Sequence, residues 1–298
     1  MGGGNKLLFD EIVIKKPIIK GWSCDKKYCV TVGEGTKYLL RITPYDKSES
    51  RNELFEILKR VSSLHIPMCK PIEIGTCESG VYILHTWVDG KDAEDVIPLL
   101  AESEQYAFGL KAGAILKLIH SIPAPETQEA WHVRFNRKTD RKIKKYRECG
   151  IRFDGDDKVM EYLVNNRDVL KDRPQTFQHG DYHIGNMMIE NGELVIIDFD
   201  SFDFGDPWEE LNRIVWCAQS SPCFATGMID GYFDKCPSIE FWKCLAFYIC
   251  SNTLSSIYWA IDFGQSDLDV MMKQSQDVLS WYDNFQRVVP NWYITPTL

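Results

Sequence analysis

The stretch FQHGDYHIGNMMIENGELVIIDFD, residues 177–200, restricts the fold of this chain more than any other segment. Two short apolar runs, at 186–190 and 194–198, flank a turn that contains Asn-Gly, and this pattern predicts a β-hairpin. Asp181 and Asn186 come before or at the start of the first strand, whereas Asp198 ends the second. Because antiparallel pairing joins these strand ends, we expect Asn186 and Asp198 to lie close together.

These side chains are of the types that phosphoryl transfer needs. A carboxylate accepts the hydroxyl proton of the acceptor, while an amide oxygen and a second carboxylate hold Mg²⁺ on the phosphates. The protein-kinase catalytic loop reads H-R-D-x-x-x-x-N and is followed by D-F-G. Here residues 179–186 read H-G-D-x-x-x-x-N, and D-F-D follows at residues 198–200. The spacing therefore predicts a kinase-type active site.

His183 leaves a second interpretation open. It lies four residues after His179, so the two histidines with Asp181 and Asp198 would suit the metal site of a metal-dependent hydrolase. Metal binding by a His-x-x-x-His pair requires a helix, however, and the glycines at 180 and 185 disfavour one. We favour the kinase interpretation and keep the hydrolase as an alternative.

Hydrophobic periodicity divides the chain into a β-rich part and a helical part. Residues 10–43 and 69–90 contain short apolar runs separated by turns, which predict an antiparallel sheet with one helix, residues 48–66, packed on it. Later helices are expected at 102–121, 138–149, 156–170, 206–220, 239–261 and 266–286. We predict two domains, a nucleotide-binding N-lobe with its hinge at 1–90 and a helical C-lobe with the catalytic loop and acceptor site at 91–298.

Three motifs, HGDYHIGN, IDFD and GDPWEEL, resemble those of the aminoglycoside phosphotransferase family, which shares its fold with choline kinase and, more distantly, with protein kinases. The resemblance covers nearly the whole chain. It implies an α+β, two-lobed protein kinase-like fold with a small antiparallel β N-lobe and a larger, mainly helical C-lobe. It also implies that Asp181 is the catalytic base, that Asn186 and Asp198 hold Mg²⁺, and that His179 orients the loop.

Two further aspartates have supporting roles in this interpretation. Asp200 replaces the glycine of the protein-kinase D-F-G motif, and we expect it to contact a second metal ion or to cap the strand. Asp206 is predicted to cap the next helix, with Pro207 in the first turn, because this residue pair is a common helix start.

The N-lobe has no G-x-x-x-x-G-K-[ST] phosphate-binding loop, so the nucleotide must be held in another way. The segment VGEGTK lacks the third glycine of G-x-G-x-x-G and is interpreted as a plain hairpin turn. We expect the segment KGWSCDKKYCV to fold over the phosphates instead, with Gly21, Ser23 and Lys27 contributing.

The remaining nucleotide contacts follow from the resemblance. In KYLLRI, Arg41 takes the place of the phosphate-binding lysine on the third strand, and a guanidinium group can bind phosphate oxygens through two hydrogen bonds. Glu53 would be its partner on the following helix. The backbone at His85, Trp87 and Val88, in the hinge, would bind the nucleobase.

The charge of the chain gives a prediction about the acceptor. The net charge is −9, which argues against a general nucleic-acid-binding protein, and residues 200–298 contain thirteen acidic but only five basic residues. Because the acceptor site should lie in this acidic part, we expect a cationic acceptor such as an amino sugar or a choline-like amine. By contrast, RFNRKTDRKIKKYR at 134–147 is strongly basic, and is either a solvated helix face or a contact for phosphates or an acidic partner.

The sequence thus predicts an enzyme that moves the γ-phosphate of ATP or GTP to a small-molecule hydroxyl, with Mg²⁺ as cofactor. An aminoglycoside acceptor, and with it antibiotic resistance, is favoured; the alternatives are a metabolic choline, homoserine or sugar kinase and an inactive kinase-like binding protein. The ten cysteines include no C-x-x-C pair and are interpreted as reduced thiols. Without a leader or a membrane-spanning apolar run, we expect a cytoplasmic monomer or weak dimer that binds neither membranes nor nucleic acid.

Overall fold

The computed structural model describes residues 7–19 and 25–294. The chain divides into two compact units: the first comprises Met1–Lys91 and Met187–Asp200, and the second Asp92–Asn186 and Ser201–Leu298. The boundary predicted after residue 90 therefore lies one residue from the observed one. The segment Met187–Asp200, which the sequence assigned to the C-lobe, belongs instead to the first unit.

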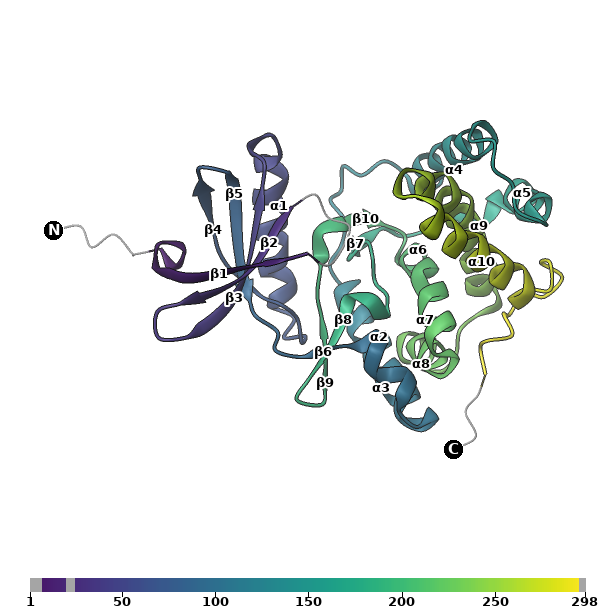
Figure 1. Ribbon diagram of the computed structural model, residues 1–298. Helices are drawn as coiled ribbons and strands as arrows, with labels where there is room; N and C mark the ends of the chain where they lie inside the picture. Colours follow the sequence, from purple (N-terminus) through teal and green to yellow (C-terminus); the bar gives the residue numbers. More distant parts are fainter. Residues whose placement is uncertain (1–6, 20–24, 295–298) are drawn as a thin grey trace. The chain divides into compact units, whose positions relative to one another are not determined.

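The first unit is built on a five-stranded antiparallel sheet (Figure 1). Its strands lie in the order β1 (Ile12–Ile18), β2 (Lys26–Val32), β3 (Thr36–Thr43), β5 (Gly80–Thr86) and β4 (Pro71–Cys77). β2 and β3 are joined by the predicted glycine-containing hairpin turn, in which Gly33 and Gly35 have positive φ. Alternate residues of the strands, including Val30, Leu40 and Tyr82, form an apolar core on one face of the sheet.

Helix α1 (Ser48–Ser62) packs on this sheet through β4 and β5. Its buried residues are Leu54, Ile57, Leu58 and Val61, the helical spacing on which its prediction rests. The short 3-10 helices η1 (Leu8–Glu11) and η2 (Tyr45–Lys47) precede β1 and α1.

The predicted hairpin forms from β8 (Met187–Glu190) and β9 (Glu193–Ile196), which pair antiparallel. Asn191 and Gly192 in its turn both have positive φ, as the favoured two-residue hairpin turn requires. Cys69 N donates a hydrogen bond to Ile196 O at 3.1 Å, and Val195 is buried against Cys69 and Val88. These contacts explain why the hairpin belongs to the first unit.

The second unit is mainly helical. Two short strands, β7 (Thr176–Gln178) and β10 (Asp203–Gly205), pair within it. Strand β6 (Lys91–Asp92) spans the boundary between the two units in the sequence. Its helices are α2 (Ala93–Val96), α3 (Glu102–Ile119), α4 (Trp131–Glu148), α5 (Asp156–Asn165), α6 (Pro207–Glu210), α7 (Ile214–Ser220), α8 (Pro222–Phe233), α9 (Ile239–Ala260) and α10 (Gln265–Trp281). Helices α4, α5 and α10 each pack against α9 (Figure 1).

Helices α3 and α8 lie in backbone contact. Gly109 and Gly113 on α3 face Gly227 and Gly231 on α8, and a Cβ atom at any of these four positions would collide with the backbone of the other helix. Glycine at these positions therefore permits a close approach of two helices. Hydrophobic periodicity predicted α3, but no helix was expected at the position of α8.

Helix α9 contributes many residues to an apolar core of the second unit, among them Cys244, Phe247 and Leu254. The segment Ile239–Phe263 is long and apolar enough to cross a membrane by length and composition, but 67% of its apolar window is buried inside the protein. We therefore assign it as a core helix. Its cysteines, Cys244 and Cys250, are free thiols, as are all other cysteines within the described residues.

Candidate active site

The H-G-D motif begins directly after β7. Gln178, the last residue of β7, pairs with Asp203 of β10. Gly180 follows with φ +89°, a left-handed conformation that residues with a side chain rarely adopt. A Cβ atom here would also collide with the carbonyl oxygen of Ser201. The glycine is therefore required both by its conformation and by the close approach of a neighbouring segment.

Glu210 on α6 holds this loop in place. Its carboxylate accepts hydrogen bonds from the backbone N–H of His179 at 2.6 Å and of Gly180 at 2.8 Å. His120 Nε2 lies 3.5 Å from the same carboxylate, and Glu210 is only 2% exposed. A buried carboxylate with two backbone donors fixes the loop conformation strongly. No pattern in the sequence predicted this role of Glu210, and the one signal for it is the position of Glu210 four residues after the predicted cap, Asp206.

Asp206 caps α6 as predicted. Its side chain accepts a hydrogen bond from Trp208 N at 3.0 Å, and a proline is the first residue of the helix. The same buried carboxylate accepts hydrogen bonds from Arg173 Nε at 2.7 Å, Arg173 Nη2 at 2.9 Å and Tyr248 OH at 2.5 Å. The guanidinium of Arg173 lies 3.4 Å from the centre of the Trp208 ring. The cap is thus a buried ionic centre that fixes α6 and, through it, Glu210.

Asp181 is held by three side chains. Arg213 Nε lies 3.1 Å from Asp181 Oδ1, Asn186 Nδ2 donates to Oδ2 at 3.0 Å, and His183 Nε2 lies 3.4 Å from Oδ2. Burial raises the pKa of the Asp181 carboxyl, but the hydrogen bond from His183 and the charge of Arg213 lower it by more, so this pKa lies well below its ordinary value. The group is therefore a carboxylate at neutral pH and can accept a hydrogen bond from a hydroxyl.

Asn186 uses its amide nitrogen within the loop. Nδ2 donates to the backbone oxygen of Asp181 at 2.9 Å as well as to its carboxylate. The amide oxygen is the remaining ligand atom, and oxygen is the ligand that Mg²⁺ prefers. The structure thus brings Asp181 and Asn186 together. Asp198 belongs to the first unit, so the predicted approach of Asn186 to Asp198 stays a prediction.

The two histidines of the loop have structural contacts. His179 is fully buried, and its Nδ1 accepts a hydrogen bond from Asp181 N at 3.3 Å, in agreement with an orienting role. His183 Nδ1 accepts a hydrogen bond from Gly185 N at 3.1 Å, and its Nε2 faces Asp181. Within residues 7–19 and 25–294, no group of three or more His, Cys, Asp or Glu side chains is placed to hold a metal ion.

In the first unit, Arg41 on β3 gathers three aspartates. Nη1 donates to Asp198 Oδ1 at 2.8 Å, Nη2 lies 3.4 Å from Asp25 Oδ2, and Asp200 forms a further ion pair with Nη2. Asp198 has φ +66°, a conformation that is strained for a residue with a side chain and is often found at functional sites. The predicted phosphate-binding arginine and the predicted metal ligand Asp198 are therefore direct neighbours.

The prediction that Glu53 pairs with Arg41 is wrong. Glu53 is exposed on α1, whereas Arg51 reaches the acidic residues around Arg41. Arg51 Nη2 lies 3.1 Å from Asp25 Oδ2, and Nη1 lies 3.1 Å from Asp200 Oδ1. The reason is helical geometry: residues two apart point in different directions, and Arg51 is on the face of α1 that also carries the buried apolar side chains.

Lys27 lies opposite Arg41 in the pairing of β2 with β3. Burial lowers the pKa of Lys27 below its ordinary value. The charge of Asp198 acts in the opposite direction, whereas the charge of Arg41 lowers this pKa further. Lys27 is therefore a further basic group beside the predicted phosphate-binding arginine. Gly21 and Ser23 lie outside the described residues, and their contact with the phosphates stays a prediction.

The predicted hinge begins at the end of β5. His85 is 5% exposed, and neither ring nitrogen has a hydrogen-bond partner within the described part of the chain. Burial and the charge of Arg41 lower the pKa of His85 to about 3, so this side chain is neutral. Trp87 Nε1 donates to Asp89 Oδ1 at 3.3 Å, and Val88 is buried. Nucleobase binding by this backbone stays a prediction.

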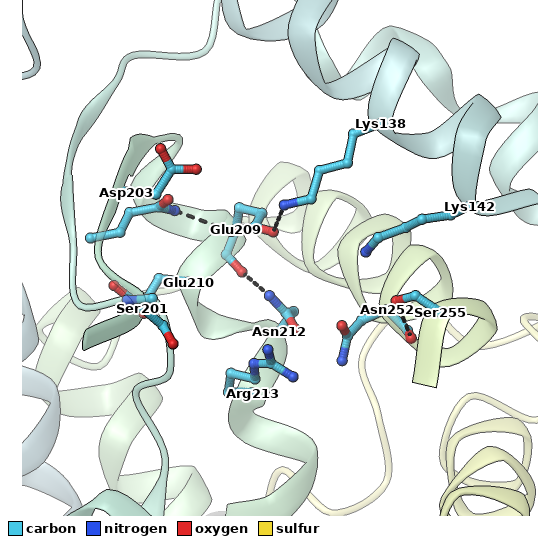
Figure 2. Close-up of a pocket in the computed structure, with 12 residues that line it drawn as sticks. Lys138, Lys142, Ser201, Asp203, Glu209, Glu210, Asn212, Arg213, Asn252 and Ser255 are labelled. Carbon is cyan, nitrogen blue, oxygen red and sulfur yellow. Dashed lines mark hydrogen bonds and ion pairs between the residues drawn. The ribbon is translucent and has the colours of Figure 1, made fainter. Parts of the chain in front are cut away.

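A pocket of about 270 Å³ lies within the second unit, and Figure 2 shows the side chains that line it. Gly180 and Arg213 line it, and Arg213 contacts the Asp181 carboxylate, so the pocket adjoins the predicted base. Its other lining residues are polar or charged and come from helices, turns and short strands: Lys138, Lys142, Gln178, Ser201, Asp203, Glu209, Glu210, Asn212, Asn252 and Ser255. A polar cavity next to a carboxylate is suited to a small, hydroxyl-bearing molecule.

The family of the chain follows from its sequence as a whole. The sequence model of the phosphotransferase enzyme family matches residues 16–246, more than half of the 298 residues. The chain belongs to this family. A search of curated proteins finds no relative that matches.

Solved structures similar to this phosphotransferase include aminoglycoside kinases. The apo form of a thermostable mutant of aminoglycoside phosphotransferase APH(4)-Ia has a TM-score of 0.67 and 16% identity, over 91% of this chain and 95% of that chain. Its ternary complex with ADP and hygromycin B has a TM-score of 0.64 and 17% identity, over 91% and 95%. The gentamicin complex of APH(2")-IIa has a TM-score of 0.64 and 16% identity, over 95% and 94%. At these identities the likeness shows the fold, and the predicted protein kinase-like α+β class is confirmed.

Arg51 gives a first testable prediction for this phosphotransferase. Replacing Arg51 with methionine is expected to lower the free energy of unfolding by about 1–3 kcal/mol, because the buried Asp25 loses its ion pair with Arg51. Urea unfolding followed by circular dichroism measures the change. The exposed Arg60 on the same helix is the matched control, and an Arg51→Met effect no larger than that of Arg60→Met would contradict the role of Arg51.

Proposed function

We propose that this protein transfers the γ-phosphate of ATP or GTP to a hydroxyl group of a small molecule, with Mg²⁺ as cofactor. The observation that carries the proposal is the pairing of an ionised Asp181 with Asn186 in one loop, beside a polar pocket. Membership of the phosphotransferase family supports the reaction class. The ADP bound in a solved structure of similar fold supports an adenine nucleotide as donor.

In the proposed reaction, the hydroxyl oxygen of the acceptor forms a bond to the γ-phosphorus, and the bond from this phosphorus to the β–γ bridging oxygen breaks. Asp181 accepts a hydrogen bond from the hydroxyl, orients it, and takes its proton as the new bond forms. The low pKa of Asp181 makes it a weak base, but a loose transition state needs positioning of the hydroxyl more than early removal of its proton. Arg213 and Asn186 keep the carboxylate in place.

Two residues have the donor atoms that Mg²⁺ needs. The amide oxygen of Asn186 and the carboxylate of Asp198 are hard oxygen ligands, and they would hold the ion. When bound, Mg²⁺ neutralises the negative charge of the phosphates and of the leaving nucleoside diphosphate. The proposal for the metal rests on the chemistry of these donors and on the strained, αL conformation of Asp198.

The cationic side of the nucleotide site lies in the first unit. Arg41, Arg51 and Lys27 lie together around Asp198 and Asp200, and these cations would bind the polyphosphate. Because the guanidinium group of Arg41 is planar and rigid, it can bind two oxygens of one phosphate group. The assignment of Arg41 as the phosphate-binding residue is therefore part of the proposal.

An aminoglycoside acceptor is the second, narrower candidate. The observation in its favour is that the solved structures of similar fold include complexes with hygromycin B and with gentamicin. The carboxylates of Asp203 and Glu209 in the pocket would be the groups that attract amines. If this candidate is correct, the protein confers antibiotic resistance.

The proposed metal site can be tested by nucleotide binding. Asn186→Ala and Asp198→Ala are each expected to weaken ATP binding in the presence of Mg²⁺ about ten-fold or more, because each removes an oxygen ligand. Isothermal titration calorimetry with and without Mg²⁺ measures this. With EDTA in place of the metal, the variants and the wild type should bind ATP alike.

His183→Ala is the matched control for the metal site. It is expected to leave Mg²⁺-dependent ATP binding unchanged, because histidine is a poor ligand for this hard ion. If His183→Ala instead removed a stoichiometric zinc ion from the purified protein, the metal-dependent hydrolase would replace the proposed function.

A further inference from the structure

The basic segment at 134–147 folds as α4, and part of it lines the pocket beside Asp181. The buried face of α4 carries Trp131, Phe135, Thr139 and Ile143, so its cations lie on the remaining sides. Lys138 and Lys142 both reach into the pocket, as Figure 2 shows. The run is therefore not only a solvated helix face, because two of its lysines are directed at the proposed acceptor.

The carboxylates of the pocket are already occupied by other groups. Glu210 is buried and accepts the two backbone hydrogen bonds of the catalytic loop. Asp203 forms an ion pair with Arg134, and Phe204 N donates to its Oδ1 at 2.7 Å. Glu209 accepts a hydrogen bond from Gln178 at 3.2 Å and lies 3.5 Å from Lys138 Nζ. Little anionic charge is thus free to bind a cationic ligand.

Lys142, by contrast, has no ion-pair or hydrogen-bond partner within residues 7–19 and 25–294. Three cations act on it: Lys138 and Arg141 from its own helix, and Arg213 from η7 (Leu211–Arg213). One carboxylate, that of Glu209 on α6, acts in the opposite direction. The pocket residues Asn252 and Ser255 of α9 are neutral. Burial, together with the charge of Lys138, lowers the pKa of Lys142 to about 7. The ammonium form of this lysine therefore has less stabilisation here than in water.

We propose that the acceptor of phosphoryl transfer carries an anionic group, a carboxylate or a phosphate, that binds to Lys142 while its hydroxyl lies at Asp181. This inference rests on the proposed function. An anion at this place supplies the negative charge that Lys142 lacks, and Arg213 connects the pocket to the Asp181 carboxylate.

A binding experiment on the whole protein tests the anion site without turnover. Lysine ε-carbons are followed by NMR during pH titrations with gluconate or glycerol 3-phosphate, and with the neutral glucitol or glycerol as matched controls. An anion bound at Lys142 is expected to raise its pKa by about one unit or more, since an opposite charge favours the charged form. Anion binding should therefore weaken as the pH rises above about 7. No difference between the anionic and neutral probes at Lys142 would overturn the proposal.

Phosphoryl transfer then tests the class of acceptor. With Mg²⁺ and ATP, the anionic compounds are expected to be used at least about ten-fold better, as kcat/KM, than glucitol, glycerol or the cationic kanamycin. Lys142→Met should raise KM for the anionic acceptor about ten-fold without changing KM for ATP, and Lys142→Arg should restore most of it. Lys144→Met, at an exposed position on the same helix, is the control and should have no effect.

Failure of this inference can be told apart from failure of the proposed function. ATP hydrolysis that depends on Mg²⁺, measured without any acceptor, reports the donor side alone. If hydrolysis is present but kanamycin is the better acceptor, the anionic acceptor is excluded and the aminoglycoside candidate stands. If hydrolysis and Mg²⁺-dependent ATP binding are both absent, the proposed function fails, while the NMR titration still decides whether Lys142 is an anion site.

Discussion

Asp181→Asn should lower the rate of phosphoryl transfer about 10²–10⁴-fold, the range that a positioned acid–base group contributes. Asparagine keeps the shape of the side chain and its contact with Arg213 in part, but its amide cannot take up the hydroxyl proton. Affinity for Mg²⁺ and ATP should change little. Steady-state release of ADP with a true acceptor measures the rate, and isothermal titration calorimetry measures the affinity.

The pH profile gives this prediction a control. Because the folded-state pKa of Asp181 lies below its ordinary value, the carboxylate stays ionised as the pH falls, and its protonation should not limit the wild-type rate until well below pH 4. An acid limb of the wild-type profile at higher pH must come from another group. Transfer by Asp181→Asn at the wild-type rate would show that Asp181 is not the base.

Asp206→Ala should lower the free energy of unfolding by about 3–5 kcal/mol, the usual cost of removing one partner of a buried ion pair. The substitution removes the carboxylate that pairs with Arg173 and that accepts the hydrogen bond from Tyr248 OH. It also removes the cap of α6, so Trp208 N loses its hydrogen-bond acceptor. Because α6 carries Glu210, the hydrogen bonds to the catalytic loop should weaken too. Urea unfolding monitored by circular dichroism measures the loss.

Asp262, exposed on the 3-10 helix η8 (Ile261–Phe263), is the control for this experiment. Its replacement with alanine should change stability by no more than about 0.5 kcal/mol, as is usual for surface positions. If Asp206→Ala unfolded at the same urea concentration as Asp262→Ala, the buried ionic centre would not contribute to stability as described.

Local signals predicted many elements of the fold. The Asn-Gly turn and its apolar flanks specified the β8–β9 hairpin, and the aspartate before a proline specified the start of α6, because each depends on neighbouring residues alone. The prediction for α4 began at residue 138, seven residues late, since the basic residues hid the periodic spacing of Trp131 and Phe135. Helix α8 was missed because Gly227 and Gly231 resemble helix breakers; only contact with α3 explains them.

In the active site, too, only the features that depend on neighbouring residues could be predicted from the sequence. Asp181 and Asn186 lie in one loop, so their spacing carried the information. The ion pairs around Arg41 join residues that are far apart in the sequence, such as Arg41 and Asp198. No local pattern predicts that Arg51, and not Glu53, takes part in these ion pairs. The residues that line the pocket come from helices, turns and strands between residues 138 and 255, which only the tertiary structure brings together.

The assignment of Met187–Asp200 to the first unit bears on how this protein is made. The first unit is not a continuous piece of chain: its apolar contact of Cys69 and Val88 with Val195 requires residues that are synthesised more than a hundred positions later. Because the chain emerges from the ribosome at about 5–20 residues per second, the first unit stays without its β8–β9 hairpin for at least about 5 seconds. During that interval the surface that Val195 will cover is open to water, to chaperones and to other nascent chains.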